Sequence, residues 1–316
     1  MTTLNTAAHA PAWSHARAAW VMVLATLLWS IVGVVTRQLQ AAQGFEITFW
    51  RSFFNALALL VIFPFWQGSG VFARFPWRSW AFWLSGLCWA TMFTAFMVAL
   101  TMTGVARVLV TMALGPLLTA LLSRVATGHR LPARTWVAIV LAGVGMGWMF
   151  AGRLGEGGAA ASTEWLGSVV ALGVPIGAAI NWTVVQRSQA RGASINLVPA
   201  VLLGGVLSAA FTLPLAWPLQ ATAHDLAWLS LLGVMQLAVP CVLVVLAAQV
   251  LPAAEVSLLA LLEVVFGILL VWWLAGEAPR PEVLQGGALV LGALLGNEWV
   301  GWRNASRDEQ VPLGPA

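Results

Sequence analysis

The sequence predicts an all-α membrane protein of ten transmembrane helices, arranged as two inverted five-helix repeats with both termini in the cytoplasm. Three features lead to this prediction: a scarcity of charge, apolar runs of membrane-spanning length, and a repeat with an odd number of helices. Of the 316 residues, 60% are hydrophobic and 8% are charged, and the mean hydropathy is +0.89. A soluble domain carries about 25% charged residues. Lipid must therefore solvate most of this surface.

Ten apolar runs have the length that crosses roughly 30 Å of hydrocarbon at about 1.5 Å per helical residue. They cover residues 18–38, 45–66, 79–100, 104–124, 132–151, 164–186, 195–216, 226–248, 252–274 and 282–302. The polar stretches between these runs are too short to bury a soluble core. We expect tails at 1–17 and 303–316 and an outer linker at 152–163.

The arginines predict the orientation of the helices. All 15 basic residues are arginines. If the N-terminus is cytoplasmic and the chain crosses ten times, ten arginines face the cytoplasm and three face outward, while Arg51 and Arg107 fall within helices. This is a strong positive-inside bias. The sequence therefore predicts a multi-pass protein of a bacterial inner membrane with both termini in the cytoplasm.

An internal repeat relates the fourth and fifth predicted helices to the ninth and tenth. The run Val105-Ala106-Arg107-Val108 aligns with Ala253-Ala254-Glu255-Val256 at an offset of 148 residues. A unit of five helices has an odd number of crossings, so a second copy is inserted upside down. The predicted units are 18–151 and 164–302. Inverted repeats are typical of transporters, whose substrate site lies near the midplane between the two copies.

Several short runs resemble a known family. They are Leu28-Trp29-Ser30, Phe49-Trp50-Arg51, Gly115-Pro116-Leu117-Leu118 and Leu251–Leu259 with Glu263 beyond it. On these runs the sequence resembles the ten-helix bacterial permeases of the drug/metabolite transporter superfamily, EamA type, over residues 18–302. The resemblance implies a transporter, usually an exporter in bacteria, and leaves the substrate open. Two positions depart from the pattern, which often has Glu-Pro at Glu263-Val264 and Gly-Glu at Gly128-His129.

Glu263 is the first candidate for coupling or substrate binding. It lies about ten residues from each end of the ninth predicted helix, hence on the order of 15 Å from either interface. A charge at that depth costs roughly 2.5–3.5 kcal/mol, so the side chain must face protein or a wet cavity. We hypothesise that Glu263 couples proton or substrate movement. The alternative is a structural carboxyl group bonded to a neighbouring helix.

Arg51 is the second candidate, in the second predicted helix, with Asn55 one turn further along the same face. A guanidinium group can bind a substrate carboxylate with two hydrogen bonds. Arg51 could also extend outward as a structural charge. Arg107, in the first turn of its helix, favours that second interpretation. Glu255, at the start of the ninth helix, complements the helix dipole as a capping residue or joins Glu263 on one broad face.

Polar residues on three further helices complete the candidate set. Trp29 and Ser30 lie in the first helix, Asn181 and Trp182 in the sixth, and Gln236 in the eighth. An amide exposed to lipid is unfavourable, so these side chains should point inward. They either line a substrate path or hold helices together. Glycine pairs spaced by four residues, such as Gly143 and Gly147, allow close helix contact and suggest supports or a homodimer face.

The composition excludes several activities. Without lysine, the chain cannot be a Walker-type ATPase or form a lysine Schiff base. The four histidines have no metal-ligand spacing, so we expect no metal or cofactor. The arginines are spread over short loops, which argues against nucleic-acid binding. We expect no enzyme activity, because no polar catalytic cluster is visible at either interface.

The leading hypothesis is secondary active transport by alternating access, in the export direction. The substrate would be a small organic metabolite such as an amino acid, and protons are the candidate coupling ion. The alternative within transport is efflux of drugs or lipophilic cations, which needs Glu263 and an aromatic cavity but is disfavoured if Arg51 faces that cavity. A membrane enzyme or a scaffold without transport activity is the alternative of another class.

Overall fold

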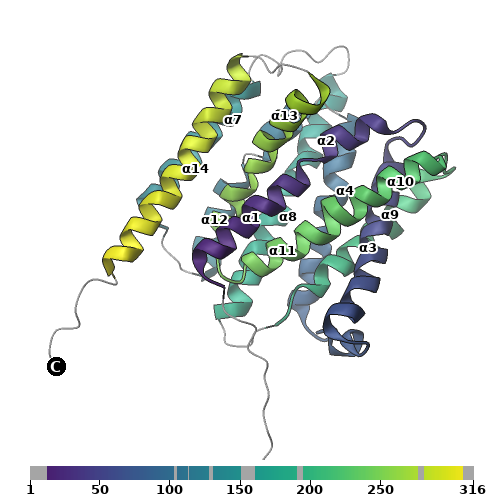
Figure 1. Cartoon of the computed structure of the whole chain (residues 1–316), viewed down its shortest axis with the longest axis horizontal. Helices are drawn as coiled ribbons and strands as arrows, with labels where there is room; N and C mark the ends of the chain where they lie inside the picture. The colour runs from purple at the N-terminus through teal and green to yellow at the C-terminus, as the bar shows by residue number, and fades with distance from the viewer. Residues whose placement is uncertain are drawn as a thin grey trace, which may run out of the picture.

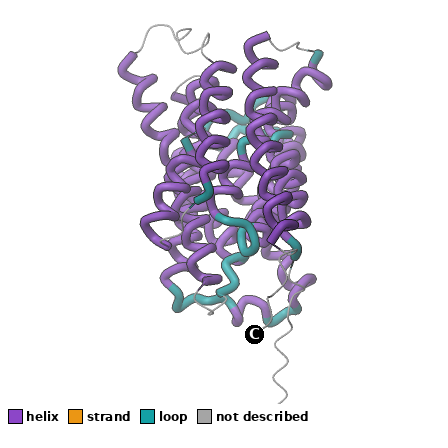
Figure 2. The backbone as a smooth tube through the Cα atoms, turned by 90° about the vertical axis from the view of Figure 1, so that its left-hand side faces the viewer, coloured by secondary structure: helices purple, strands orange, loops and turns teal. Residues whose placement is uncertain are grey.

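The protein is an entirely helical bundle over the residues that the computed structural model describes, which are 13–102, 105–112, 114–127, 131–150, 161–190, 195–276 and 281–308 (Figures 1 and 2). Seven helical stretches within these residues are long and apolar enough to cross a membrane. They are His15–Gln38, Phe45–Gln67, Trp80–Met102, Leu166–Ser188, Pro199–Ala216, Ala223–Ala247 and Ala253–Leu274. Two shorter apolar helices are Gly115–Ala126 and Ala133–Trp148. The count of ten spans and the orientation of the termini stay predictions.

Over the described residues, most of each predicted span is helical. The continuous helices are α3 (Phe45–Gln67), α4 (Trp80–Met102), α7 (Ala133–Phe150), α8 (Ala161–Ala190), α9 (Pro199–Ala216) and α14 (Pro281–Asp308). The described residues also include the 3₁₀ turns η1 (Thr36–Gln38) and η2 (Val71–Arg74). Proline lies inside α3, α8 and α9 without ending them, because neighbouring helices can compensate for the lost hydrogen bond.

Four of the predicted spans are interrupted near their middle. The first consists of α1 (His15–Trp29) and α2 (Val32–Val35), and the fourth of α5 (Val105–Met112) and α6 (Gly115–Thr127). The ninth consists of α12 (Ala253–Ala260) and α13 (Leu262–Ala275). The eighth runs from α10 (Ala223–Leu231) through a π-helical segment, η4 (Leu232–Ala238), into α11 (Val239–Ala247). Irregular backbone at membrane depth is tolerated where protein or a cavity surrounds it.

The helix boundaries repeat at the offset that the sequence suggested. The helices α5 and α12 begin at Val105 and Ala253, which are 148 residues apart. The same interval separates the ends of α6 and α13, at Thr127 and Ala275, and the starts of α7 and α14. The interruption of the fourth span therefore recurs in the ninth.

Helices from the two parts of the chain are interleaved. The helix α4 packs against α8 and α9, and α3 packs against α9 and η4. The helices α7 and α14 pack mainly against each other and form a pair at one edge of the bundle, seen at the left of Figure 1. This pair meets at Gly145, where an added Cβ would lie 2.8 Å from the Gly286 carbonyl oxygen. Gly143 and Gly147, which the sequence suggested as a contact face, have no neighbour within 4 Å of an added Cβ.

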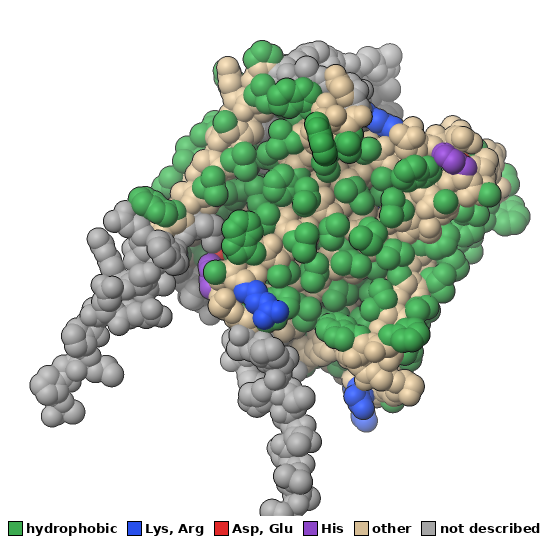
Figure 3. Space-filling view, viewed as in Figure 1, with side chains coloured by type: hydrophobic (Ala, Val, Ile, Leu, Met, Phe, Trp, Pro, Cys, Tyr) green, Lys and Arg blue, Asp and Glu red, His purple; other side chains and the backbone are tan. Residues whose placement is uncertain are grey.

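The outer surface suits a lipid environment. Large apolar side chains are exposed on the membrane-spanning helices, for example Leu24, Leu60 and Val61. Figure 3 shows one face covered almost continuously by hydrophobic side chains, with arginine and histidine near its edges. Exposing this apolar surface to water would be unfavourable, whereas lipid acyl chains solvate it. The fold is therefore that of a multi-pass membrane protein.

Candidate functional site

A partly open cavity of about 130 Å³ lies between the interrupted helices and the continuous helices α3, α4 and α8. It is lined by residues from the break in the first span (Trp29), the break in the fourth (Met112 and Gly115) and the π-helical segment (Gln236 and Leu237). The break in the ninth span contributes Ala260, Leu261, Glu263 and Val264. The remaining lining residues are Arg51, Trp89, Met92, Phe93, Phe96, Val174, Pro175, Ala178, Trp182, Cys241 and Ser257.

Arg51 forms no ion pair with any residue in the described part of the chain. Its side chain is 2% exposed, and its Nη1 donates to the thioether sulfur of Met97, at 3.6 Å. Its Nε has no hydrogen-bond partner. A buried guanidinium group without hydrogen-bond acceptors is unfavourable, and a charged acceptor stabilises it most. An anionic group that entered the cavity would satisfy this guanidinium group.

Glu263 supplies the opposite charge in the same cavity. It lies in the first turn of α13 and is only partly buried, because its carboxylate borders the cavity space. The two charges are near enough to interact electrostatically. No ion pair joins them, however, nor does Glu263 pair with any other residue in the part of the chain that the structure describes. The cavity is therefore lined by one guanidinium group and one carboxyl group, which form no ion pair with each other.

Gln236 adds an amide beside these charges. The π-helical segment presents it to the cavity, and its Nε2 donates to the Trp29 carbonyl oxygen at 3.5 Å. That carbonyl is at the end of α1, where the helix breaks and leaves its last carbonyls without helical partners. The Gln236 Oε1 has no hydrogen-bond partner. A ligand with a donor group would satisfy it.

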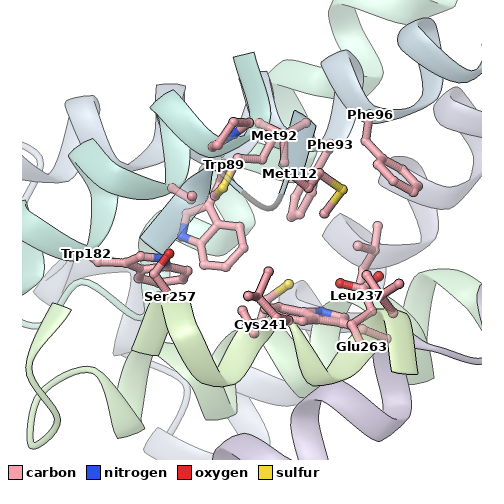
Figure 4. Close-up of a pocket in the computed structure, with 18 of the residues that line it drawn as sticks. Trp89, Met92, Phe93, Phe96, Met112, Trp182, Leu237, Cys241, Ser257 and Glu263 are labelled. Carbon is pink, nitrogen blue, oxygen red and sulfur yellow. The ribbon is translucent and has the colours of Figure 1, made fainter. Parts of the chain in front are cut away.

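The other end of the cavity is aromatic and polarisable. Trp89 and Trp182 are almost fully buried and pack edge to face, with ring centroids 5.5 Å apart. Figure 4 shows Trp182 and Ser257 at one end of the pocket and Glu263 and Leu237 at the other. Met92 and Met112 contribute flexible thioether chains, which adapt to irregular apolar groups. Figure 4 also places Phe93, Phe96 and Met112 across the pocket from Glu263, so apolar side chains line the cavity at both ends.

Five of the residues singled out in the sequence meet in this cavity: Arg51, Glu263, Trp29, Trp182 and Gln236. Ser30 and Asn55 lie outside it. The Ser30 hydroxyl donates to the Leu27 carbonyl oxygen at 2.6 Å within its own helix. Asn55 is fully buried against α9, where an added Cβ at Gly205 would lie 2.5 Å from its Nδ2.

Three further candidates are not among the residues that line the cavity: Asn181, Glu255 and Arg107. Asn181 Oδ1 accepts a 2.6 Å hydrogen bond from the Ser85 hydroxyl, which joins α8 to α4. Glu255 contacts His15, with Nε2 and Oε1 2.8 Å apart, so the contact links the starts of α12 and α1 and is an ion pair when His15 is protonated. Arg107 belongs to α5, and its side chain is outside the part that the structure describes.

Sequence reasoning missed the aromatic wall on α4. Trp89, Phe93 and Phe96 look like lipid-facing residues in an apolar run, because a lipid-facing and a cavity-facing aromatic side chain give the same hydropathy. One signal was available. Tryptophan concentrates near the membrane interfaces, and Trp89 lies in the middle of α4.

Comparisons with known proteins agree with this architecture. A model of the EamA-like transporter family matches twice, over residues 16–151 and 165–297. Twenty-six chains of solved structures match the fold. One crystal structure aligns over 92% of this chain and 99% of its own, with a TM-score of 0.74 and 19% sequence identity. A search of curated proteins found no match.

The two family matches together span most of the chain and include every described residue of the cavity wall. The resemblance drawn from short sequence runs is thus confirmed. The chain belongs to the EamA-like transporter family and is a membrane transporter of small molecules.

Proposed function

We propose that this protein is a secondary active transporter that exports small zwitterionic metabolites, such as amino acids, across the inner membrane by alternating access. The observation that carries the proposal is the pair Arg51 and Glu263, which have opposite charge and line one cavity without forming an ion pair. A zwitterion would satisfy both charges. Its carboxylate would meet the guanidinium group and its ammonium group would meet Glu263 and the free Gln236 Oε1.

The aromatic end of the cavity would take the apolar part of the same substrate. Trp89 and Trp182 offer large apolar faces at low cost in side-chain entropy. The charged end fixes the orientation, and the apolar end contributes burial of about 25 cal/mol for each Å² of apolar surface. This division is the usual arrangement of a small-molecule site, in which a few polar groups orient a ligand against an apolar wall.

The topology that this mechanism requires is ten spans in two inverted repeats, 18–151 and 164–302, with both termini cytoplasmic. The recurrence of helix boundaries at an interval of 148 residues supports the repeat. The interrupted fourth and ninth spans would be the elements that move around the site. Glu263, which borders the cavity, is the group proposed to exchange protons with the aqueous phases and to couple transport to a proton gradient.

Efflux of lipophilic cations is the weaker candidate. A site for cations needs an anion and aromatic faces, which Glu263 and the two tryptophans provide. Arg51 lines the same cavity, however, and would repel a cation there. The geometry therefore favours a substrate with both charges.

Counterflow in proteoliposomes tests the proposal. Vesicles containing the purified protein are loaded with an unlabelled metabolite, and uptake of the labelled compound is followed with and without a pH gradient. We expect counterflow for zwitterionic amino acids and none for tetraphenylphosphonium. Counterflow for the cation, without counterflow for any zwitterion, would overturn the proposal in favour of drug efflux.

A further inference from the structure

Two buried carboxylates lie outside the cavity, at one end of the bundle. Glu46 is in the first turn of α3 and is 5% exposed. Asp225 is in the first turn of α10 and is fully buried. Neither lines the cavity, and the transport proposal does not use them. A buried carboxylate is costly unless it accepts several hydrogen bonds, so the partners of these two groups indicate what they do.

Glu46 holds the loop that precedes α10. Its Oε1 accepts hydrogen bonds from the backbone N–H groups of Gln220 and Ala221, both at 2.8 Å, and from the indole of Trp50 at 3.2 Å. The two backbone donors are 174 and 175 residues away along the chain. The start of α3 is therefore fastened to the start of α10.

Asp225 makes the reciprocal connection to the loop that precedes α3. Its Oδ1 accepts from the backbone of Gln40 at 2.7 Å, and its Oδ2 accepts from Ala41 at 3.0 Å and Ala42 at 3.1 Å. Asp225 also completes a capping box with Thr222 at its own helix start. Each carboxylate thus binds the loop that leads into the other's helix.

The same two helices meet again at the level of the cavity. An added Cβ at Gly233, in η4, would lie 2.9 Å from the Arg51 carbonyl oxygen and 2.4 Å from the Phe54 Cβ. Glycine is thus what allows the backbones of η4 and α3 to touch beside Arg51. Gln236 follows three residues later in η4 and lines the cavity with Arg51.

We propose that Glu46 and Asp225 are positioning residues of the substrate site, which fix α3 and the continuous helix α10–η4 as a single body that carries Arg51 and Gln236 together through the transport cycle. The inference rests on the proposed function in its use of Arg51 as the carboxylate-binding group. The helices α3 and α10 fall in different family-model matches, so this body crosses the boundary between the repeats. Glu263 is on α13, which packs on α1 and α2, outside the body. Transport would then change the separation between Arg51 and Glu263 and leave Arg51 and Gln236 in place.

Cross-linking tests whether the two loops bound by Glu46 and Asp225 stay together during transport. Gln40 and Gln220 have exposed side chains next to the bonded backbone groups, and both native cysteines are buried, so Gln40→Cys with Gln220→Cys offers two reactive thiols. A bis-maleimide with a cleavable spacer should link them without loss of counterflow. The matched pair is Gln220→Cys with Trp273→Cys on the exposed face of α13. Linking this pair should stop counterflow, and cleaving the spacer should restore it. Arrest by the Gln40–Gln220 link, reversed on cleavage, would show that the connection opens in each cycle and would overturn the proposal.

Spin-label distances separate this inference from the transport proposal. With nitroxides on the same cysteine pairs, we expect one narrow distance distribution between positions 40 and 220 at low and high pH, in detergent and in lipid. The distribution between positions 220 and 273 should shift or broaden among these conditions. Two populations for the first pair would overturn the inference. If no zwitterion shows counterflow, the proposed function fails, whereas the spin-label result still decides whether the two helices form one body.

The Asp225→Asn variant distinguishes positioning from a merely structural role. The amide presents a donor where Asp225 faces four backbone N–H groups, so α3 and α10 should lose their fixed register. We expect a raised KM for the zwitterion at an almost unchanged maximal rate, measured per mole of monodisperse protein. Glu282→Gln removes a charge at an exposed position of α14 and should change neither constant. A lower yield of folded protein with an unchanged KM would assign Asp225 to folding alone and contradict the proposal.

Discussion

Arg51 and Glu263 line one cavity with opposite charges, and no ion pair joins them. Arg51 comes from the second turn of a continuous helix, whereas Glu263 comes from the first turn after a helix break. Direct contact between them would neutralise both groups and leave little for a ligand to bind. Because they do not pair, both groups remain available to bind a ligand in the same cavity.

Replacing Arg51 by glutamine should weaken substrate binding. The substitution removes a charge-assisted hydrogen bond to the substrate carboxylate, which is worth about 1.5–3 kcal/mol. The apparent KM for counterflow of a zwitterion should rise by about tenfold to a hundredfold, since 1.4 kcal/mol corresponds to a factor of ten. The control Arg74→Gln makes the same change at an exposed position. An unchanged KM in Arg51→Gln would assign Arg51 to structure.

Replacing Glu263 by glutamine should separate exchange from net transport. The amide cannot bind and release a proton, so uptake driven by an imposed pH gradient should be lost. Counterflow at equal pH should persist with a higher KM, because the amide oxygen still accepts a hydrogen bond from the ammonium group. Glu282→Gln, on an exposed part of α14, serves as the control. Gradient-driven uptake at the native rate in Glu263→Gln would contradict proton coupling through this residue.

Trp182→Ala should change which substrates are preferred. Trp182 is 3% exposed and packs edge to face on Trp89 at the apolar end of the cavity. Removing its ring deletes the wall against which a large apolar side chain would pack. Competition by large zwitterions such as phenylalanine should weaken relative to competition by alanine. Trp83→Ala, on the exposed face of α4, should leave the ranking unchanged. An unaltered ranking in Trp182→Ala would place the substrate side chain elsewhere.

Gly145→Val should destabilise the pair formed by α7 and α14. A Cβ at position 145 would lie 2.8 Å from the Gly286 carbonyl oxygen and 2.9 Å from the Val290 Cγ2, so the helices must separate. Overpacking of this kind typically costs about 1–3 kcal/mol. The thermal midpoint of the purified protein should fall. Gly143→Val adds the same side chain where nothing lies within 4 Å, and its midpoint should remain native. Equal midpoints for the two variants would contradict this contact.

Hydropathy predicted the spans well because burial in lipid dominates their composition. It placed the predicted span 45–66 on α3 and the span 132–151 on α7 with nearly the observed ends. The helix breaks could not be located in this way. The break at Leu261 and the π-helical segment around Gln236 occur within apolar sequence. Local hydrophobicity therefore carries no record of where the backbone departs from the α-helix.

Charged residues within the predicted spans identified the cavity more reliably than uncharged polar residues did. Arg51 and Glu263 could be identified because a charge at membrane depth is too costly to face lipid. Asn55 and Asn181 are uncharged. The free-energy cost of placing an amide at membrane depth is avoided equally well against a neighbouring helix or beside a cavity. The structure buries Asn55 against Gly205 and bonds Asn181 to Ser85, choices that depend on contacts far apart in sequence. Glu46 and Asp225 were not singled out because their partners are backbone groups of distant loops.

A competition experiment with three related compounds measures the central relationship most directly. Leucine, the amine that lacks its carboxylate, and the acid that lacks its ammonium group are each added to proteoliposomes during counterflow of a labelled zwitterion. If Arg51 and Glu263 bind the two ends of one substrate, leucine should compete strongly and each single-charge analogue weakly. Competition by the amine equal to that by leucine would show that Arg51 takes no part in recognition, and the two-charge site would be wrong.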